Sequence, residues 1–256
     1  MESQEPLREG RTKLTILKLE GVSKSFSDKT VLRKVTFDVN EGEIVSIIGP
    51  SGSGKTTLLR LIDLLDYPTS GRIIFDGIDA NSSESLRHSI RMKIGMVFQQ
   101  PILFDTNVYN NVAYGLRIRG VEEEKIKERV KSSLNLVGLS GFDKRKAYTL
   151  SGGEAQRVAI ARVIVYQPEL ILLDEPTANL DPYNVAIIEE IISKINRNFN
   201  ATIIMATHNM FQAKRLGKKV VFLLDGEVVE IGKVDKIFED PQDRRTKSFI
   251  KGEMIY

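Results

Sequence analysis

The sequence has no cysteine, only two histidines among 256 residues, and no apolar run long enough to cross a bilayer. Without cysteine the chain can form neither a disulfide framework nor a thiolate metal site, and thiol redox chemistry is excluded. The longest apolar runs, such as residues 44–48 and 170–173, have the length of β-strands, whereas a membrane span needs about 20 residues. These absences fit a cytosolic protein.

The charge is also without a strong bias, because 37 Lys and Arg residues face 34 Asp and Glu residues and the net charge is +3. No basic tail or block points to nucleic acid. Residues 1–13 are polar and of mixed charge, so they lack the apolar core of a secretion signal. We expect a flexible N-terminal tail over residues 1–13 and a single domain over residues 14–256.

Strand-like segments bounded by turn residues dominate the first third of the chain, at residues 14–19, 34–39, 44–48 and 72–75, and one helix is expected after Thr56. Between about residues 105 and 165 the apolar residues recur at helical spacing, which indicates an inserted helical subdomain.

The last third reads as a strand, helix and strand followed by a hairpin. Residues 170–173 and 202–205 are apolar strands on either side of a helical stretch at 184–196, a pattern that predicts a largely parallel sheet buried on both faces. Residues 220–231 form a predicted β-hairpin, and a short helical tail is expected from Lys236 onward.

Residues 49–56 have the form G-x-x-x-x-G-K-[ST] and lie between an apolar strand and a helix, the context that a phosphate-binding loop requires. Glycines let successive backbone N–H groups turn toward an anion, and the following helix adds the positive end of its dipole. Lys55 is expected to reach the β- and γ-phosphates of a nucleotide, and the Thr56 hydroxyl to ligate Mg²⁺. The alternative is a Gly/Ser-rich surface turn that ends in Lys-Thr by chance, which the flanking strand and helix make rare.

Asp174 and Glu175 directly follow the apolar strand at residues 170–173. Ligands bind at the carboxyl edge of open α/β sheets, so both carboxylates should face the phosphate loop. The aspartate can hold a magnesium-bound water, and the glutamate can orient or deprotonate the water that attacks the γ-phosphate. The alternative is that the pair only caps the helix after Pro176.

Two further features are candidates for phosphate contacts. The Leu-Ser-Gly-Gly-Glu turn at residues 150–154 opens a helix, and Ser151 with the free N–H groups there could receive a phosphate, although the turn by itself is more typical of a helix N-cap. His208 follows an apolar strand and could hydrogen-bond the γ-phosphate, with a capping or core role as the alternative. His88 lies in a polar stretch and is expected on the surface.

Motif for motif, in order and over nearly its full length, the chain resembles the ATP-binding-cassette (ABC) ATPases. The matching motifs are a Walker A loop at residues 49–56, a Q-loop glutamine at Gln99, a signature motif at 150–154, the end of Walker B at Asp174 and Glu175, a D-loop at 178–181 and a switch histidine at His208. Phe26, ahead of the first predicted strands, resembles the aromatic residue that stacks on adenine, although such a residue is also typical of a core. The resemblance implies an α/β fold: a P-loop NTPase core with a largely parallel sheet, an N-terminal antiparallel β subdomain and an inserted helical subdomain.

The resemblance also implies ATP hydrolysis with ATP and Mg²⁺ as cofactors. It assigns catalysis to Glu175, His208, Gln99 and Lys55, and metal binding to Thr56, Gln99 and Asp174. The residues implied to bind the nucleotide are Phe26, Gly49, Pro50, Ser51, Gly52, Ser53, Gly54, Lys55, Thr56, Thr57, Ser151, Gly152, Gly153, Glu154 and Asp181.

The sequence departs from the family pattern at two positions and leaves a third open. Glu154 stands where the signature motif usually has glutamine, and Asn179 stands in a D-loop that more often reads Ser-Ala-Leu-Asp. Gln100 beside Gln99 leaves the Q-loop assignment open by one residue.

The family's transport members form head-to-tail dimers that sandwich two ATP molecules. The resemblance therefore implies a homodimer at the cytoplasmic face of the membrane, bound peripherally to permease subunits through the helical subdomain and residues 99–111, with an extracellular solute-binding protein as an indirect partner and no nucleic acid. Residues 97–115, 150–156 and 249–256 most resemble importers of small oxyanions in the phosphate and tungstate/molybdate group.

Three alternatives stay open at the level of the sequence. A cassette ATPase of DNA repair, translation or iron–sulfur assembly typically adds a second cassette, a coiled coil or a basic surface, and none is visible here. An export-type subunit would share the same motifs. A non-catalytic nucleotide-binding module would be expected to lack Lys55 or Glu175, and both are present.

Overall fold

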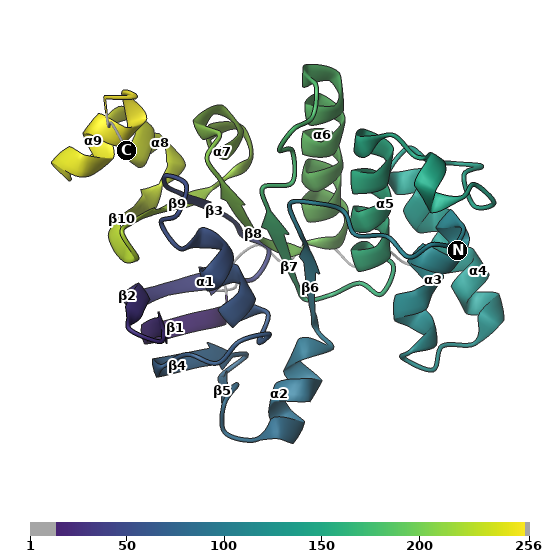
Figure 1. Ribbon diagram of the computed structural model, residues 1–256, viewed down its shortest axis with the longest axis horizontal. Coiled ribbons are helices and arrows are strands. Elements are labelled where there is room, and N and C mark those ends of the chain that lie inside the picture. Colours follow the sequence, from purple (N-terminus) through teal and green to yellow (C-terminus); the bar gives the residue numbers. More distant parts are fainter. Residues whose placement is uncertain (1–13, 254–256) are drawn as a thin grey trace, which may run out of the picture.

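The computed structural model describes residues 14–253, and Figure 1 shows two sheets with helices around them. The predicted tail over residues 1–13 and the last three residues lie outside the described part. Within it no helix is long and apolar enough to cross a membrane.

The smaller sheet is antiparallel, with the strand order β2-β1-β4-β5. Its strands are β1 (Thr15–Phe26), β2 (Lys29–Asn40), β4 (Ser70–Phe75) and β5 (Ile78–Asp79). β1 and β2 are longer than the strands predicted at residues 14–19 and 34–39, because register shifts let the polar segment around Gly21 and Ser23 continue the pairing. Phe26 is therefore the last residue of β1 rather than a residue ahead of the strands.

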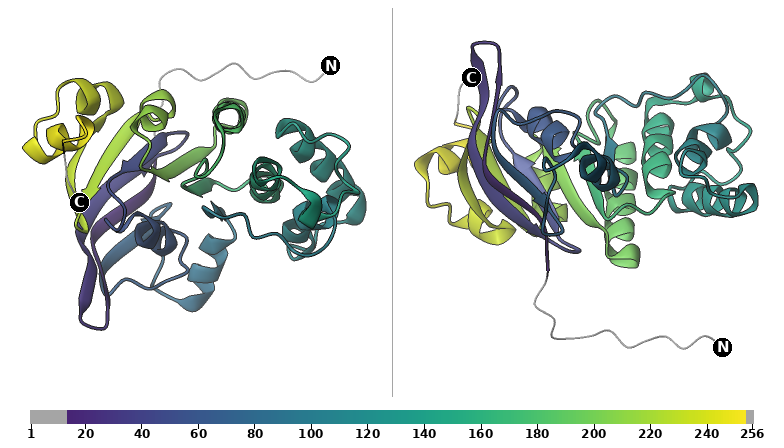
Figure 2. Two further views of the ribbon diagram at one scale, coloured as in Figure 1. Left: turned by 45° about the horizontal axis from the view of Figure 1, so that its top comes forward. Right: turned by 90° about the horizontal axis from the view of Figure 1, so that it is seen from below.

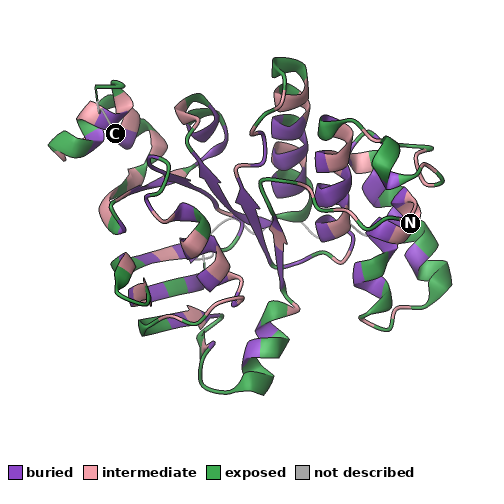
Figure 3. Cartoon of the chain, in the orientation of Figure 1, coloured by how far each residue is buried: buried purple, intermediate pink, exposed green. Residues whose placement is uncertain are grey.

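The larger sheet has the order β10-β9-β3-β8-β7-β6, and all its neighbouring pairs except β9 with β10 are parallel. Its strands are β3 (Ile44–Ile48), β6 (Ile94–Val97), β7 (Leu170–Asp174), β8 (Thr202–Thr207), β9 (Lys219–Leu224) and β10 (Glu227–Lys233). Every residue of β3, β7 and β8 is buried, as Figure 3 shows, which is why these strands read as continuous apolar runs. The prediction of a largely parallel sheet is confirmed.

One face of the larger sheet packs on α1 (Lys55–Ile62), which lies between the two sheets. The sequence did not predict α2 (Glu84–Arg91). Its buried residues are Arg87 and Ile90, so its sequence lacks an apolar stripe. Arg87 is buried because its guanidinium donates to the carbonyls of Leu64 and Asp66 and to the side chain of Asn81.

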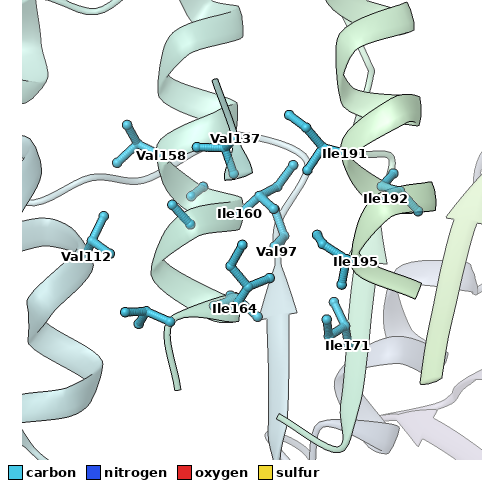
Figure 4. Packing of buried hydrophobic residues seen from close by; sticks show 14 of the residues in the cluster. Val97, Val112, Val137, Val158, Ile160, Ile164, Ile171, Ile191, Ile192 and Ile195 are labelled. Atoms are coloured by element: carbon cyan, nitrogen blue, oxygen red, sulfur yellow. The ribbon is translucent and has the colours of Figure 1, made fainter. Parts of the chain in front are cut away.

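The other face packs on α5 (Gly152–Ile164) and α6 (Pro182–Phe199), as Figure 4 shows for the isoleucine and valine residues that meet there. α3 (Val108–Arg117) and α4 (Glu123–Leu136) pack on α5 at the end of the molecule farthest from β10, and the short helix η1 (Ala147–Thr149) precedes α5. These helices fall within the segment predicted to be helical.

Three of the described helices pack beside β9 and β10. α7 (Met210–Leu216) precedes β9, whereas α8 (Val234–Glu239) and α9 (Arg244–Ile250) follow β10. Phe249 of α9 stacks on Phe222 of β9 with ring centroids 4.8 Å apart. Figure 2 shows the β1–β2 hairpin and these C-terminal helices at one end of the molecule and α3 and α4 at the other.

Candidate active site

The phosphate loop joins β3 to α1. Gly54 caps α1 with φ of 103°, in the left-handed region, and a Cβ at this position would lie 2.7 Å from Cδ2 of Leu32. Both the backbone and the available space therefore require glycine. The first N–H groups of α1 have no acceptor within the helix and are available to an anion.

Lys55 lies under this loop. Its ammonium donates to the carbonyl oxygens of Gly49 at 2.8 Å and Pro50 at 2.9 Å, and the residue is only 7% exposed. Burial lowers the pKa of the amine, and the nearby carboxylates of Glu175 and Asp174 oppose that shift. The backbone of the loop thus holds the Lys55 ammonium, which is predicted to bind phosphate, close to the loop.

Thr56 and Asp174 meet although 118 residues separate them in the sequence, because α1 follows β3 and packs against β7. The Thr56 hydroxyl donates to Oδ1 of Asp174 at 3.2 Å. Burial raises the pKa of this carboxyl above its ordinary value, and the Thr56 hydrogen bond opposes the rise. A bound cation would favour the ionised carboxylate, so the hydroxyl and carboxylate suit a divalent metal.

Glu175 and His208 form a pair that the sequence did not reveal. Nδ1 of His208 lies 2.9 Å from Oε2 of Glu175, and the His208 backbone N–H donates to the same oxygen at 3.3 Å. Glu175 has φ of 46°, a left-handed conformation that costs a non-glycine residue about 1–3 kcal/mol. The Glu175 N–H donates to the Ala206 carbonyl, and this bond, the His208 N–H and the neighbouring imidazole hold the carboxylate just after β7 in spite of that cost.

A cleft of about 350 Å³ brings nine of the nineteen predicted site residues together. Its lining consists of Val31, Ser51, Gly52, Gly54, Lys55, Thr56, Thr57, Gln99, Glu175 and His208. Gln99, and not Gln100, belongs to this lining. Val31 was not predicted, because a valine in a β-strand carries no signal that separates a cleft position from a core position.

Several predicted residues lie beside or away from this cleft. Gly49, Pro50 and Ser53 are buried within the loop, and the Ser53 hydroxyl has no hydrogen-bond partner among the described residues. Phe26 is 49% exposed, so the alternative of a core residue is wrong. The Lys24 ammonium lies 4.8 Å from the centroid of the Phe26 ring, and Phe26 is not part of the cleft lining.

The signature turn lies elsewhere in the chain. Ser151 caps α5, its hydroxyl accepting from the Glu154 N–H at 3.3 Å while Oε2 of Glu154 accepts from the Ser151 N–H at 2.8 Å. Oε1 of Glu154 accepts from Arg145 at 3.0 Å. The hydrogen bond from the Ser151 backbone is the main reason that the pKa of Glu154 is lowered. Both carboxylate oxygens are thus used within the chain, and Glu154 acts as part of the helix cap.

This turn and the phosphate loop do not share a cleft within one chain. In the larger sheet, the edge strand β6 is three strands away from β3, a distance of roughly 14 Å at about 4.8 Å per strand. In Figure 1, α5 lies on the side of β6 that faces away from α1. None of the residues from Ser151 to Glu154 belongs to the cleft lining. One chain therefore carries two separated phosphate-binding candidates.

The D-loop leads into α6 beside the signature turn. Asp181 caps α6 by accepting from the N–H groups of Tyr183 at 3.0 Å and Asn184 at 3.1 Å. The Asn184 side chain also donates to Asp181 and is the main reason that the pKa of this carboxyl is lowered. Asn179 has φ of 60°, a left-handed conformation that asparagine adopts more readily than most residues.

Comparison with known proteins identifies the family of the chain. The ABC transporter family profile matches residues 32–178. A phosphate import ATP-binding protein, PstB 2, from Natronomonas pharaonis is 47% identical over 94% of this chain and 88% of its own length. A probable anion import ATP-binding protein from Haloferax volcanii is 39% identical, covering 96% and 90%. The methionine import ATP-binding protein MetN 2 from Rhodococcus jostii is 43% identical, covering 92% and 71%.

Solved structures show the same likeness. The cbiO1 protein from Clostridium perfringens, part of the ABC transporter complex cbiONQ, has a TM-score of 0.82 at 32% identity, covering 93% of this chain and 96% of its own. The dimeric structure of MJ0796, a bacterial ABC transporter cassette, has a TM-score of 0.79 at 36% identity, covering 86% and 99%. A dimeric post-hydrolysis state of the same cassette, bound to ADP and Pi, has a TM-score of 0.78. With a family profile over more than half of its length and relatives aligned over more than nine-tenths of it, the chain belongs to the ABC transporter family and is an ATP-hydrolysing nucleotide-binding subunit.

Proposed function

We propose that this subunit powers the import of a small oxyanion, such as phosphate or tungstate, through separate permease subunits at the cytoplasmic face of the membrane. The observation that carries the proposal is the 47% identity, over 94% of the chain, to a protein named for phosphate import. A second relative is named for anion import and a third for methionine import. Import is common to all three names, and an anionic solute is common to two.

The cleft supports a specific division of labour in hydrolysis. The loop N–H groups and Lys55 would bind the phosphates of ATP, and Thr56, Gln99 and Asp174 would hold Mg²⁺. A bound Mg²⁺ would stabilise the negative charge that develops in the transition state. Glu175 accepts a proton from the attacking water, and His208, already in contact with Glu175, keeps its carboxylate in place and donates to the γ-phosphate.

Separation of the two phosphate-binding candidates supports a head-to-tail homodimer. Ser151, Gly152 and Gly153 lie outside the cleft of their own chain, so a second copy can bring them to the opposite side of the bound ATP. Each ATP would then be held by Lys55 of one copy and Ser151 of the other. Hydrolysis removes the γ-phosphate contacts and lets the two copies separate.

Large apolar side chains exposed near the Q-loop support permease docking. Those on residues 98–118 are Phe98, Ile102, Phe104, Tyr114 and Ile118, with exposures from 37% to 75%. The ring centroids of Phe104 and Tyr114 lie 4.8 Å apart, and Arg162 donates to the Ile102 carbonyl at 2.9 Å. A patch of this kind fits an apolar segment of a membrane subunit. Its proximity to Gln99 would couple docking to the cleft.

Uptake by proteoliposomes tests the proposal. The subunit, its permease subunits and the solute-binding protein are reconstituted, and ATP-dependent accumulation of labelled phosphate, tungstate and methionine is compared, with the Glu175→Gln variant as the inactive control. Oxyanion uptake that stops in the variant is expected. Uptake of methionine alone would overturn the oxyanion assignment, and ATPase stimulation by nucleic acid instead of the transport complex would overturn the transporter assignment.

A further inference from the structure

Asn184, the third residue of α6, lies directly against the glycine turn that opens α5. We propose that Asn184 is a positioning residue that holds the signature turn and the D-loop of one chain in a fixed arrangement. Residue 153 is then glycine because Asn184 fills the space that a side chain would need. The inference rests on the proposed function, in which both turns act on the ATP bound by the second copy.

Gly153 is not required by its backbone conformation. It is the second residue of α5 and has no positive φ, so alanine would be favoured there by about 1 kcal/mol on helix propensity alone. Gly153 is nevertheless buried within the single chain. A Cβ at this position would lie 2.5 Å from Cγ of Asn184 and still closer to its Oδ1. Real Cβ atoms do not come this close to other atoms, so the Asn184 side chain would have to shift to admit a side chain at residue 153.

Asn184 cannot move aside without a loss. Its Nδ2 donates to Oδ2 of Asp181 at 2.6 Å, and its backbone N–H donates to Oδ1 of the same carboxylate at 3.1 Å. To make room for a Cβ on residue 153, the amide would have to rotate away from Asp181. A change at the signature turn is thereby transmitted to the D-loop carboxylate.

Gly152 provides the contrast that isolates this effect. It is exposed, and the nearest atom to a Cβ added there is Cδ2 of Leu180 at 3.8 Å, an ordinary van der Waals distance. Leu180 belongs to the D-loop, so both glycines face the same segment, but only Gly153 conflicts with Asn184. Asn184 therefore joins two turns that are about 30 positions apart in the chain into one unit that faces the partner.

A double-mutant cycle tests the inference on the full-length protein. We expect Gly153→Ala to lower the kcat of ATP hydrolysis by at least about 10-fold, and by no more than about 3-fold when Asn184→Ala is also present. Asn184→Ala alone should lower kcat with little change in KM, because the cleft that binds ATP is unaltered. Asn184→Ser should recover kcat, since its hydroxyl can still donate to Asp181. In the matched cycle, Gly152→Ala should cost the same in the wild-type protein and in the Asn184→Ala variant.

Three results would overturn the inference. Gly153→Ala could cost the same in both backgrounds, which would mean that its Cβ conflicts with the partner's nucleotide and not with Asn184. Asn184→Ala could keep the wild-type kcat, or Asn184→Ser could fail to recover it. If Gly153→Ala is too unstable for kinetics, the melting temperature replaces kcat in the cycle, and Asn184→Ala is expected to raise it toward the wild-type value. Failure of the proposed two-copy site would be separate, seen as ATP-loaded Glu175→Gln protein that stays monomeric at high concentration.

Discussion

The two glycine turns of this chain contain the same residue type for different physical reasons. In the phosphate loop, Gly54 has a left-handed backbone and lies against Leu32, so its conformation and its space both require glycine. In the signature turn, Gly152 and Gly153 begin a regular helix with ordinary dihedral angles. The phosphate loop lines the cleft of its own chain, whereas no residue of the signature turn from Ser151 to Glu154 does. The comparison shows that glycine can be required in a motif either for its backbone conformation or because a neighbouring side chain leaves no space for a Cβ.

The largest expected effect is on the rate of ATP hydrolysis, and it tests whether the two turns act on one ATP. Glu175→Gln should lower kcat by about 10²–10⁴-fold, because the water loses its proton acceptor while the ATP-binding loop stays intact. Steady-state ATPase assays measure the loss, and sedimentation in the presence of ATP should show a dimer. A variant that stays monomeric with bound ATP at high concentration would contradict the two-copy site.

Substitution by alanine separates the two kinds of glycine. Gly54→Ala should lower the free energy of unfolding by about 2–4 kcal/mol, since it adds backbone strain and a clash with Leu32. Gly152→Ala should change it by less than about 1 kcal/mol, in the stabilising direction. Urea unfolding followed by circular dichroism measures both values. Equal losses would mean that the two turns do not differ in the way described.

A carboxyl group at the far end of α1 from the phosphate loop and another at the start of α5 should respond to pH in opposite directions. Burial raises the pKa of Asp63, at the end of α1, to about 7, so its ionisation opposes folding and stability falls as pH rises from about 4 to 7. Asp63→Asn should therefore stabilise the protein at pH 8 by about 1–3 kcal/mol and have little effect at pH 4.

Glu154, at the start of α5, has a pKa lowered below its ordinary value of 4.5. Its contribution to stability is fully present above that value and is lost as the pH falls through the lowered pKa. Glu154→Gln should therefore lose this acid-side dependence and leave the slope between pH 6 and pH 8 unchanged. Melting temperatures of Asp63→Asn and Glu154→Gln between pH 4 and pH 8 test both expectations, and a response of the opposite sign would contradict them.

The smallest effect concerns the helix cap. Ser151→Ala removes one half of the capping box and should lower stability by about 1 kcal/mol. Because Ser151 is not part of the cleft lining, the Kd of ATP for the monomer should stay at its wild-type value while hydrolysis by the dimer falls. Equilibrium titration at low protein concentration checks this. A weaker monomer Kd would place Ser151 in the cleft of its own chain.

Prediction from the sequence worked best where neighbours in the chain carry the whole pattern. The phosphate loop and the Asp174-Glu175 pair were each assigned from one short segment, and their roles stay predictions. The largely parallel sheet was predicted from short apolar runs and is confirmed. Prediction failed for α2, whose buried residue Arg87 breaks the apolar pattern, and for the full length of β1 and β2, whose bulges hide the alternation. Phe26 is an exposed residue at the end of β1, which no local pattern distinguished from a core aromatic.

The sequence by itself determined which groups can bind phosphate and perform hydrolysis, because those properties follow from residue type and local spacing. The position of Asp174 and Glu175 after a strand also predicted that both carboxylates face the phosphate loop, but only the tertiary structure decided the individual contacts. The Thr56–Asp174 and Glu175–His208 contacts join residues 118 and 33 positions apart. The order of strands in the sheet also places the signature turn away from the phosphate loop and brings Asn184 onto Gly153. Strand order arises from packing of the whole chain and is not encoded in the spacing of any one motif.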